Sequence, residues 1–575
     1  SGTTTFNNLQ IDKTSSTATV SVGTGLTKPV NGTLTLINGQ LAGAGILEAT
    51  GPVSVSAFDG GNGNLLVSGG STRTFAISAP SSGSPAVLPS VTFNAPNTTV
   101  TSTGFGNVSF TGLLLQDVTS VTFGTPVSVS SGNAITNSSG TTLTFNASFT
   151  QSGGTFDAGA GNLDFNGGFT LSNGRFVASS NNTFASNFTF VVSGGDFEPN
   201  GGTLVFDGTI TNSQSFSVNN LTINSPMGFS SAGTTITIAG TLNLIDGIHG
   251  NGTLNALGNV IVAATFDGGT GAMAFGGGAI QTYSNSGGIN PRGNWTLNKT
   301  AGRVILDTDL DISNSTSQLF LTAGTITTGA NLLIAGTRTI NRANGFVIGN
   351  LRRSYTSAGS RVFDVGTSAG HFPVTVNATA GTFGAATTVT VSANAGALPG
   401  SAPSLSLLRH WSITASPSGV SQADLTFAYL DSDIPATAEE SQFQVLRFST
   451  TSITGLGGTL NTVANTATVS GITQFSQWGL GVLAPTSAPV TIGGRVLRPD
   501  GRGISGAVLV LTGIDSDART VRTNPFGYFK FTAAAGSSYV ITVANKSHTF
   551  EQPSIVVNPT EDITNVIFVS TPQLQ

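Results

Sequence analysis

The sequence of 575 residues contains no cysteine and very little charge. Without cysteine, disulfide bonds, thiolate metal sites and a cysteine nucleophile are excluded. Charged residues make up only 8% of the chain, the formal net charge is −5, and no block rich in Lys and Arg occurs. No nucleic acid is therefore expected as a partner, because phosphate backbones are bound through clustered cations.

Long apolar runs are also missing. No run reaches the roughly 18 residues of a membrane-spanning helix, so no membrane-spanning segment is expected. With 38% hydrophobic residues, the chain is nevertheless not a disordered polyelectrolyte. In place of charge it has 76 Gly and many Ser, Thr and Asn, which supply turns and uncharged strand faces. A start at Ser1 suits a mature secreted form or a fragment.

One long segment of the chain occurs twice. Residues 33–70 and residues 241–278 share the pattern TL-x-L-I-[ND]-G, then Gly-rich turns, a β-branched run and Phe-Asp-Gly-Gly. Such self-similarity is typical of an array in which each unit buries its apolar face against the next. The Phe-Asp-Gly-Gly segments (58–61 and 266–269) are interpreted as turns whose Asp bonds its own backbone, in preference to ligand loops.

Phenylalanine recurs between Gly-Gly and Asn-Gly turns from Thr142 to Gly208. Stacked turns would place these rings in one buried internal ladder, made of Phe145, Phe149, Phe156, Phe165, Phe169, Phe176, Phe184, Phe188, Phe190, Phe197 and Phe206. Apolar and polar residues alternate with period two across residues 1–345, and helical periodicity is missing. We therefore predict an all-β chain that opens with a β-solenoid, parallel β-helix-like, over residues 1–345. A chain of β-sandwiches is the alternative.

Residues 346–485 have longer strands, which favour an antiparallel β-sandwich. Arginine is concentrated around residue 345, at Arg342, Arg352, Arg353 and Arg361. Residues 346–485 contain Phe363-Asp364-Val365-Gly366-Thr367, then Arg409-His410-Trp411, and finally Phe475-Ser476-Gln477-Trp478-Gly479-Leu480-Gly481. These segments resemble the terminal, Ig-like β-sandwich of many large bacterial secreted surface proteins. The resemblance implies an architecture and no activity.

Residues 486–575 follow a short Pro- and Ala-rich linker and form the third predicted domain. The characteristic segments are Ile492-Gly493-Gly494-Arg495-Val496, Gly503 to Leu511, Thr523-Asn524-Pro525-Phe526-Gly527-Tyr528-Phe529, and Tyr539. They resemble the carboxypeptidase regulatory-like family, a transthyretin-like sandwich of seven strands. Asn-Pro stands at a turn where the family more often has Asp or Asn before Gly. The resemblance implies a structural or binding module without catalytic residues.

The residue types that carry catalysis are scattered. No Walker or H-E-x-x-H motif is present. The four histidines lie far apart in the sequence and do not predict a zinc site: they are His249, His371, His410 and His548. No catalytic residue and no cofactor, calcium apart, is therefore expected.

The strongest acidic feature is Asp307, Asp309 and Asp311 in the segment VILDTDLDI. On a continuous strand these carboxylates would share one face, spaced about 7 Å apart, opposite an apolar face. Carboxylates at this spacing repel one another unless they are solvated or bridged by a cation. A calcium site is one interpretation, and a solvated outer face of the solenoid is the other.

These features predict a secreted, extracellular structural protein, a subunit of a cell-surface filament, stalk or adhesin without catalytic activity. One alternative is a polysaccharide lyase or hydrolase on a parallel β-helix, which needs clustered acidic and basic residues on neighbouring turns. Another is a carbohydrate-binding surface protein, which needs exposed Trp or Tyr. Trp295 is the only tryptophan of the repeat region, and surface glycans are kept as candidate partners.

The N-terminal strand predicts self-association. Thr4 to Ile11 has the pattern of a strand, yet nothing before it in the sequence would cap a solenoid. An open end exposes unpaired backbone groups, and low charge removes the usual guard against pairing. We expect a homo-polymer formed by end-to-end β-strand contacts. The strand Ile563 to Ser570 is expected to belong to its own sandwich, which leaves the solenoid flank or the middle sandwich as the acceptor.

Overall fold

The computed structural model describes residues 4–69, 73–77, 86–95, 99–104, 107–138, 140–184, 189–208, 210–212, 214–231, 233–315, 317–483, 489–513 and 516–572. The chain divides into two compact units, Ser1–Val482 and Leu483–Gln575. The described part is almost entirely β-structure. Its helical segments are three single 3₁₀ turns, η1 (Pro403–Leu405), η2 (Asp431–Asp433) and η3 (Glu440–Gln442). The described part of residues 1–345 contains no helix, as the period-two alternation predicts.

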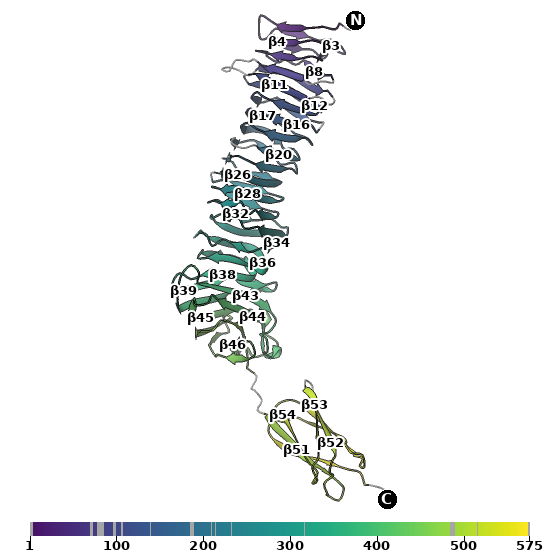
Figure 1. Ribbon diagram of the computed structural model, residues 1–575, viewed down its shortest axis with the longest axis vertical. Helices are drawn as coiled ribbons and strands as arrows, with labels where there is room; N and C mark the ends of the chain where they lie inside the picture. Colours follow the sequence, from purple (N-terminus) through teal and green to yellow (C-terminus); the bar gives the residue numbers. More distant parts are fainter. Residues whose placement is uncertain are drawn as a thin grey trace. The chain divides into compact units, whose positions relative to one another are not determined.

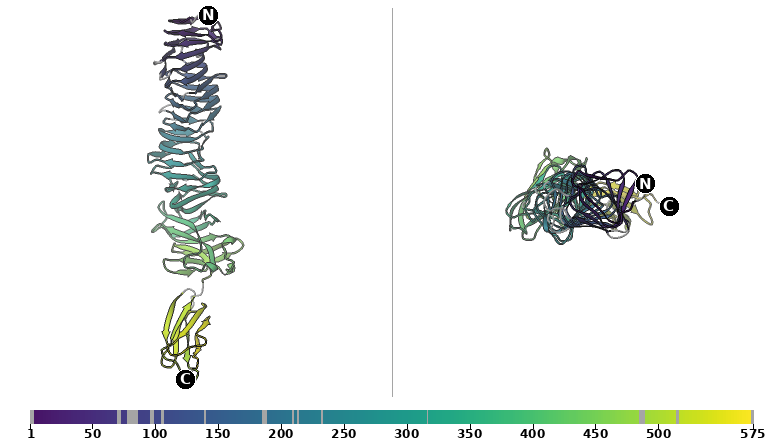
Figure 2. Two further views of the ribbon diagram at one scale, coloured as in Figure 1. Left: turned by 90° about the vertical axis from the view of Figure 1, so that its right-hand side faces the viewer. Right: turned by 90° about the horizontal axis from the view of Figure 1, so that it is seen from above.

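The first unit opens with a β-solenoid of about 15 turns, in which strands stack in parallel (Figures 1 and 2). Hydrogen bonds between successive turns join residues 19 positions apart at Thr50 and Asn31 and 25 positions apart at Thr33 and Asn8. A turn of this length holds two or three short strands joined by tight corners. The predicted β-solenoid is therefore confirmed, and the chain of sandwiches is not what residues 1–345 form.

Two rows of strands form the faces of the solenoid through its first ten turns. The first row consists of β1 (Leu9–Asp12), β4 (Leu34–Asn38), β7 (Val53–Val55), β9 (Arg73–Ile77), β11 (Thr99–Gly104), β13 (Ser120–Phe123), β16 (Thr142–Phe145), β18 (Asn162–Phe165), β20 (Asn181–Phe184) and β23 (Thr203–Phe206). The second row consists of β3 (Thr27–Val30), β6 (Ile46–Ala49), β8 (Asn64–Ser68), β10 (Ala86–Asn94), β12 (Val108–Asp117), β14 (Val127–Val129), β15 (Ala134–Asn137), β17 (Phe149–Asp157), β19 (Phe169–Val177), β21 (Phe190–Val192) and β22 (Asp196–Glu198). Alternate residues along these strands point inward and are buried.

Later turns continue the first row in one hydrogen-bonded sheet. Their strands are β24 (Ile210–Asn212), β25 (Phe216–Val218), β26 (Asn220–Ser231), β27 (Thr235–Ile238), β28 (Leu242–His249), β29 (Thr253–Ala256), β30 (Val260–Val262), β31 (Phe266–Gly268), β32 (Ala272–Phe275), β33 (Gln281–Asn285), β34 (Trp295–Leu306), β35 (Leu310–Asp311), β36 (Leu319–Gly336) and β37 (Ile340–Arg342). Several of these strands bend around a corner and so belong to two faces of the solenoid.

The two copies of the long sequence repeat form equivalent turns. Leu34 pairs with Val53 in the first copy, and Leu242 pairs with Val260 in the second. Gly61 and Gly269 end the Phe-Asp-Gly-Gly segments with φ near +100°. A Cβ at either position would lie about 2 Å from a backbone oxygen of the preceding turn. Only glycine fits there, which supports the interpretation of both segments as turns.

Phenylalanine rings fill the solenoid interior, as predicted. Three ladders run from turn to turn: Phe123–Phe145–Phe165, Phe149–Phe169–Phe190 and Phe156–Phe176–Phe197, with neighbouring centroids 4.7–5.6 Å apart. Edge-to-face contacts join the ladders into one cluster. Phe197 is partly buried, and the other predicted rings with described side chains are buried; the side chains of Phe184 and Phe188 lie outside the described residues.

An antiparallel β-sandwich closes the C-terminal end of the solenoid. β38 (Phe346–Ser354) pairs in parallel with β36 on one side and antiparallel with β43 (Thr388–Ala395) on the other. The solenoid sheet continues through β40 (Val365–Thr367), β41 (Gly370–His371), β44 (Ser406–Ala415), β46 (Gln444–Phe448), β47 (Ile453–Gly455) and β50 (Gln477–Gly481). The facing sheet contains β39 (Gly359–Phe363), β42 (Val374–Gly381), β45 (Val420–Ala428), β48 (Thr459–Asn461) and β49 (Thr466–Ile472).

One hydrophobic core therefore runs from Ile11 to Leu480 without a break between solenoid and sandwich. Phe427 of the facing sheet packs between Trp411 and Trp478, with ring centroids 4.9 and 6.0 Å apart. The predicted boundary at 345/346 falls at the start of β38, where the pairing changes from parallel to antiparallel. Both predicted domains belong to the first compact unit.

The described part of the second unit is a sandwich of seven strands in two sheets with its own core. One sheet has β54 (Tyr528–Ala534), β51 (Pro489–Leu497) and β57 (Ile563–Val569). The other has β53 (Ser516–Arg522), β52 (Val508–Gly513), β55 (Tyr539–Ala544) and β56 (Ser554–Val557). As expected, the last strand pairs within this unit, in parallel with β51.

Candidate functional site

The three aspartates of the calcium hypothesis do not lie on one strand. β34 ends at Leu306, the chain bends at Asp307 and Thr308, and β35 begins at Leu310. The expectation of a continuous strand was wrong, although all three carboxylates are exposed and their apolar neighbours are buried. The bend arises because this segment forms a corner of the solenoid.

Two of these carboxylates are bound to backbone amides. Asp309 Oδ1 accepts a hydrogen bond from Leu332 N in the next turn (2.9 Å), and Asp311 Oδ1 accepts one from Ser313 N (2.8 Å). Over the described ranges, no group of three or more His, Asp or Glu side chains is arranged to hold a metal ion. The acidic corner thus has a local structural role, and calcium binding by Asp307, Asp309 and Asp311 stays a prediction.

The sequence motifs of the middle sandwich meet at a buried ion pair. Arg409 donates to Asp433 Oδ1 (2.8 Å) and to Thr367 Oγ1 (2.8 Å). Its guanidinium lies 4.1 Å from the centroid of the Phe372 ring, and both charged side chains are buried. Trp411 Nε1 donates to Phe372 O (3.0 Å). These contacts hold the sandwich together, so the motifs are explained by structure.

Buried arginines in the last turns of the solenoid form a site that sequence reasoning missed. Arg338 donates to Ile312 O, to Gly293 O (2.9 Å) and to Arg292 O (3.3 Å), and Arg353 donates to Arg338 O (2.6 Å). Burial lowers the pKa of each guanidinium to about 10. The high density of arginine near residue 345 was the feature of the sequence that could have predicted this site. These cations tie carbonyl groups of successive turns together where the solenoid meets the sandwich.

Nearer the N-terminus of the solenoid, a buried lysine also donates hydrogen bonds to neighbouring turns. Lys299 Nζ donates to Gly276 O (2.8 Å) and to Gln281 Oε1 (2.5 Å). Gln281 in turn donates to Ala256 O and Gly258 O. Burial lowers the pKa of the Lys299 ammonium. Three successive turns are linked by this chain of polar contacts.

His249 is buried in the second repeat copy, where its Nε2 lies 3.1 Å from Ala272 O. Burial lowers its pKa to about 4 from the usual 6.5. A Cβ on Gly271 would come within 2.1 Å of the ring, so the glycine leaves room for the histidine. The equivalent residue of the first copy is Leu41, which packs on Gly63 in the same way. His249 thus fills a leucine position as a neutral side chain.

This burial predicts a local loss of stability in acid. The unfolded chain takes up a proton near pH 6.5 and the folded His249 only near pH 4. Stability of its turns should therefore fall by about 1.4 kcal/mol per pH unit as the pH drops through that window. Hydrogen exchange of the amides in β28 and β32 measures the effect. The variant His249→Leu should remove the pH dependence, and an unchanged dependence would contradict the assignment.

One pocket of the solenoid has carboxylates in its wall, which a polysaccharide-cleaving enzyme on a β-helix would need. It has a volume of about 350 Å³ and lies beside β22 and β25, with Asp196, Phe197, Glu198 and Phe216 in its wall. Both Glu198 oxygens accept hydrogen bonds from Arg175, at 2.5 and 2.6 Å. To act as an acid catalyst, Glu198 would have to lose its hydrogen bonds from Arg175 before it could donate a proton.

The described helices include none that is long and apolar enough to cross a membrane.

Comparisons with known proteins give only distant matches. No protein-family model matches the chain, and no curated protein matches it. The carboxypeptidase regulatory-like resemblance is therefore not confirmed.

Among solved structures, a C-terminal fragment of the pilus adhesin SpaC from Lactobacillus rhamnosus GG is 9% identical, with a TM-score of 0.14, and covers 29% of this chain and 78% of that chain. The group B streptococcus pilus 2b backbone protein is 10% identical, with a TM-score of 0.14, and the match covers 39% of this chain and 98% of that chain. SpaC in its open conformation is 9% identical, with a TM-score of 0.13, and the match covers 28% of this chain and 24% of that chain. These scores are too low to support an argument about function.

Proposed function

We propose that the chain is an extracellular structural protein of a bacterial surface, a subunit of a stalk, adhesin or filament without catalytic activity. The observation that carries this proposal is the unbroken hydrophobic core from Ile11 to Leu480. A solenoid filled by side chains is a stiff rod, and the sandwich that continues its sheet protects the C-terminal end.

The use of charge in the first unit supports the same role. Lys299, Arg338 and Arg353 donate to backbone carbonyls or a side-chain amide inside the stack. Arg409 is neutralised by Asp433. A catalytic groove would direct such groups toward a substrate, whereas these join one turn or sheet to the next.

The first turn supports self-assembly. β1, β2 (Thr19–Ser21) and β3 pair with β4, β5 (Gln40–Ala42) and β6, and no other strand of the described residues pairs with them. The strand is shorter than predicted: Asn7 and Asn8 form a bend, Phe6 makes a single bridge to Val30, and β1 starts at Leu9. A strand of a second copy added to this edge would extend the stack.

Assembly is testable with the full chain and a variant lacking residues 1–13. Sedimentation velocity and electron microscopy should show oligomers or filaments that grow with concentration for the full chain and are lost in the variant. A full chain that stays monomeric at high concentration, or a variant that still assembles, would contradict end-to-end assembly. Release of reducing ends from a panel of polysaccharides would contradict the absence of catalysis.

For the second unit we propose a carboxypeptidase regulatory-like, transthyretin-like module. Its seven strands in sheets of three and four support this assignment. Gly494 and Gly503, both within the matching segments, stand where a Cβ would meet backbone atoms at 1.8 and 2.2 Å. The close approach of neighbouring strands gives a physical reason for these glycines.

A further inference from the structure

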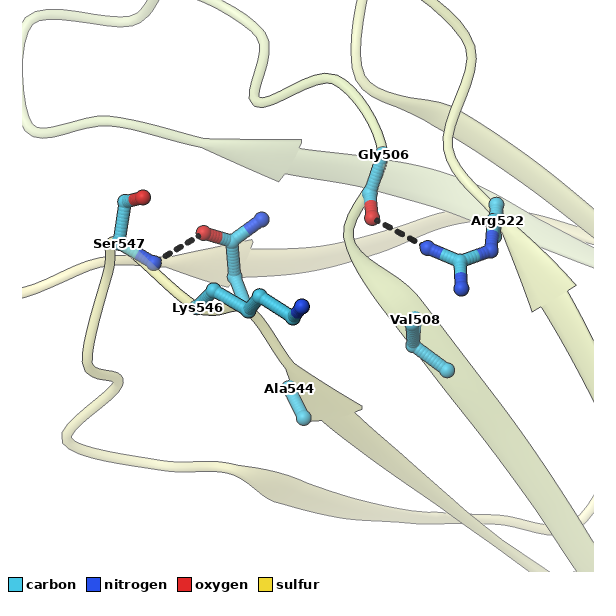
Figure 3. A pocket seen from close by; sticks show the side chains of 7 residues that line it. Gly506, Val508, Arg522, Ala544, Lys546 and Ser547 are labelled. Atoms are coloured by element: carbon cyan, nitrogen blue, oxygen red, sulfur yellow. Dashed lines mark hydrogen bonds between the residues drawn. The ribbon is translucent and has the colours of Figure 1, made fainter.

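The second unit has a pocket with two cationic side chains on its rim. The pocket has a volume of about 450 Å³ and is lined by Gly506, Val508, Arg522, Ala544, Asn545, Lys546 and Ser547. Figure 3 shows the Arg522 guanidinium and the Lys546 ammonium directed toward the same space from opposite sides, near Val508 and Ala544. None of the described residues that line the pocket is acidic.

Strand pairing builds this arrangement from three strands. Val508 of β52 pairs with Arg522 of β53 on one side and with Ala544 of β55 on the other, so the three form one row across the sheet. After Ala544 the chain turns, and Asn545 Oδ1 accepts a hydrogen bond from Ser547 N (2.9 Å). This tight turn holds Lys546 beside the end of the row.

Among the described residues, no carboxylate forms an ion pair with either cation. Arg522 Nη1 makes a long contact with Gly506 O (3.5 Å). Both cationic side chains are exposed at the pocket. Like charges that converge without a counter-charge favour an anion between them.

The remaining lining narrows the class of ligand. The volume falls within the range of small-molecule sites, about 300–1,000 Å³, and exceeds what a lone oxyanion needs. Val508 and Ala544 offer an apolar surface for the C–H face of a ring, while Asn545 and Ser547 add amide and hydroxyl groups. We propose that this pocket binds an acidic sugar residue of a surface polysaccharide, with its carboxylate held by Arg522 and Lys546.

The inference rests on the proposed function of a surface protein and adds a ligand to it. The full chain is titrated with trigalacturonate, maltotriose and inorganic phosphate by isothermal calorimetry. Trigalacturonate should bind, maltotriose should not, and binding should weaken with added salt. The double variant Arg522→Gln/Lys546→Gln should bind trigalacturonate at least about tenfold more weakly, because charged hydrogen bonds are lost.

The matched control is Arg502→Gln/Lys530→Gln, which removes the same charge from exposed positions outside the pocket and should bind like the unaltered chain. Equal losses in both double variants would overturn the pocket assignment, as would binding that survives Arg522→Gln/Lys546→Gln. Phosphate binding as tight as that of trigalacturonate would overturn the sugar specificity, and no binding would overturn the whole inference. Assembly of the unaltered chain is scored separately by sedimentation, so a failure here leaves the structural role testable by itself.

Discussion

Replacing Phe165 with alanine should lower the free energy of unfolding of the solenoid by about 3–5 kcal/mol. The ring is fully buried, and its centroid lies 5.0 Å from that of Phe145, 5.7 Å from Phe149 and 5.2 Å from Phe169. Removing it leaves a cavity in its own ladder, beside the ladder of Phe149 and Phe169. The cavity cannot collapse, because each neighbouring ring is held by the next turn.

The effect should be greatest in the turns that contact Phe165. Amide hydrogen exchange under native conditions should show faster opening of β16 to β20, with smaller changes toward the middle sandwich. Phe526→Ala is the control, since that ring is 69% exposed and lies in the second unit. Equal losses for Phe165→Ala and Phe526→Ala would contradict the stacked interior.

Replacing Asp433 with alanine should destabilise the middle sandwich by about 3–5 kcal/mol. The change leaves Arg409 charged and buried beneath Thr367, with its hydrogen bond to Asp433 Oδ1 lost. Burying a charge costs desolvation free energy, which a charged partner offsets. Removing Asp433 alone should therefore destabilise the sandwich more than removing both charges of the pair. Thermal unfolding of the full chain, followed by near-ultraviolet circular dichroism to which the buried Trp411 and Trp478 contribute, measures the change.

Two variants separate a charge effect from packing. Asp431→Ala removes an exposed carboxylate of the same 3₁₀ turn, one that accepts from Asn465, and should cost no more than about 1 kcal/mol. Arg409→Met/Asp433→Leu removes both charges and should recover most of the loss of Asp433→Ala. A double variant as unstable as Asp433→Ala would show that volume, rather than the unpaired charge, sets the cost.

The amino-acid sequence determined the features that depend on near neighbours in the chain. Alternation of apolar and polar residues sets which side chains face inward on every strand, because successive residues of a strand point to opposite faces. Glycine at Gly61 and Gly269 fixes turns in both repeat copies because other residues disfavour that backbone conformation. The spacing of phenylalanine by about one turn length placed the rings in ladders.

Tertiary structure decided what depends on contacts between distant residues. The break at Asp307 follows from the position of a solenoid corner, which local alternation does not mark. The pairing of β38 with both β36 and β43 joins the solenoid to the sandwich, and Arg338 and Arg353 lie at this junction. Arg522 and Lys546 line one pocket only because β53 and β55 both pair with β52. Strand register over long separations is set by packing of the whole core, so single segments of sequence do not carry it.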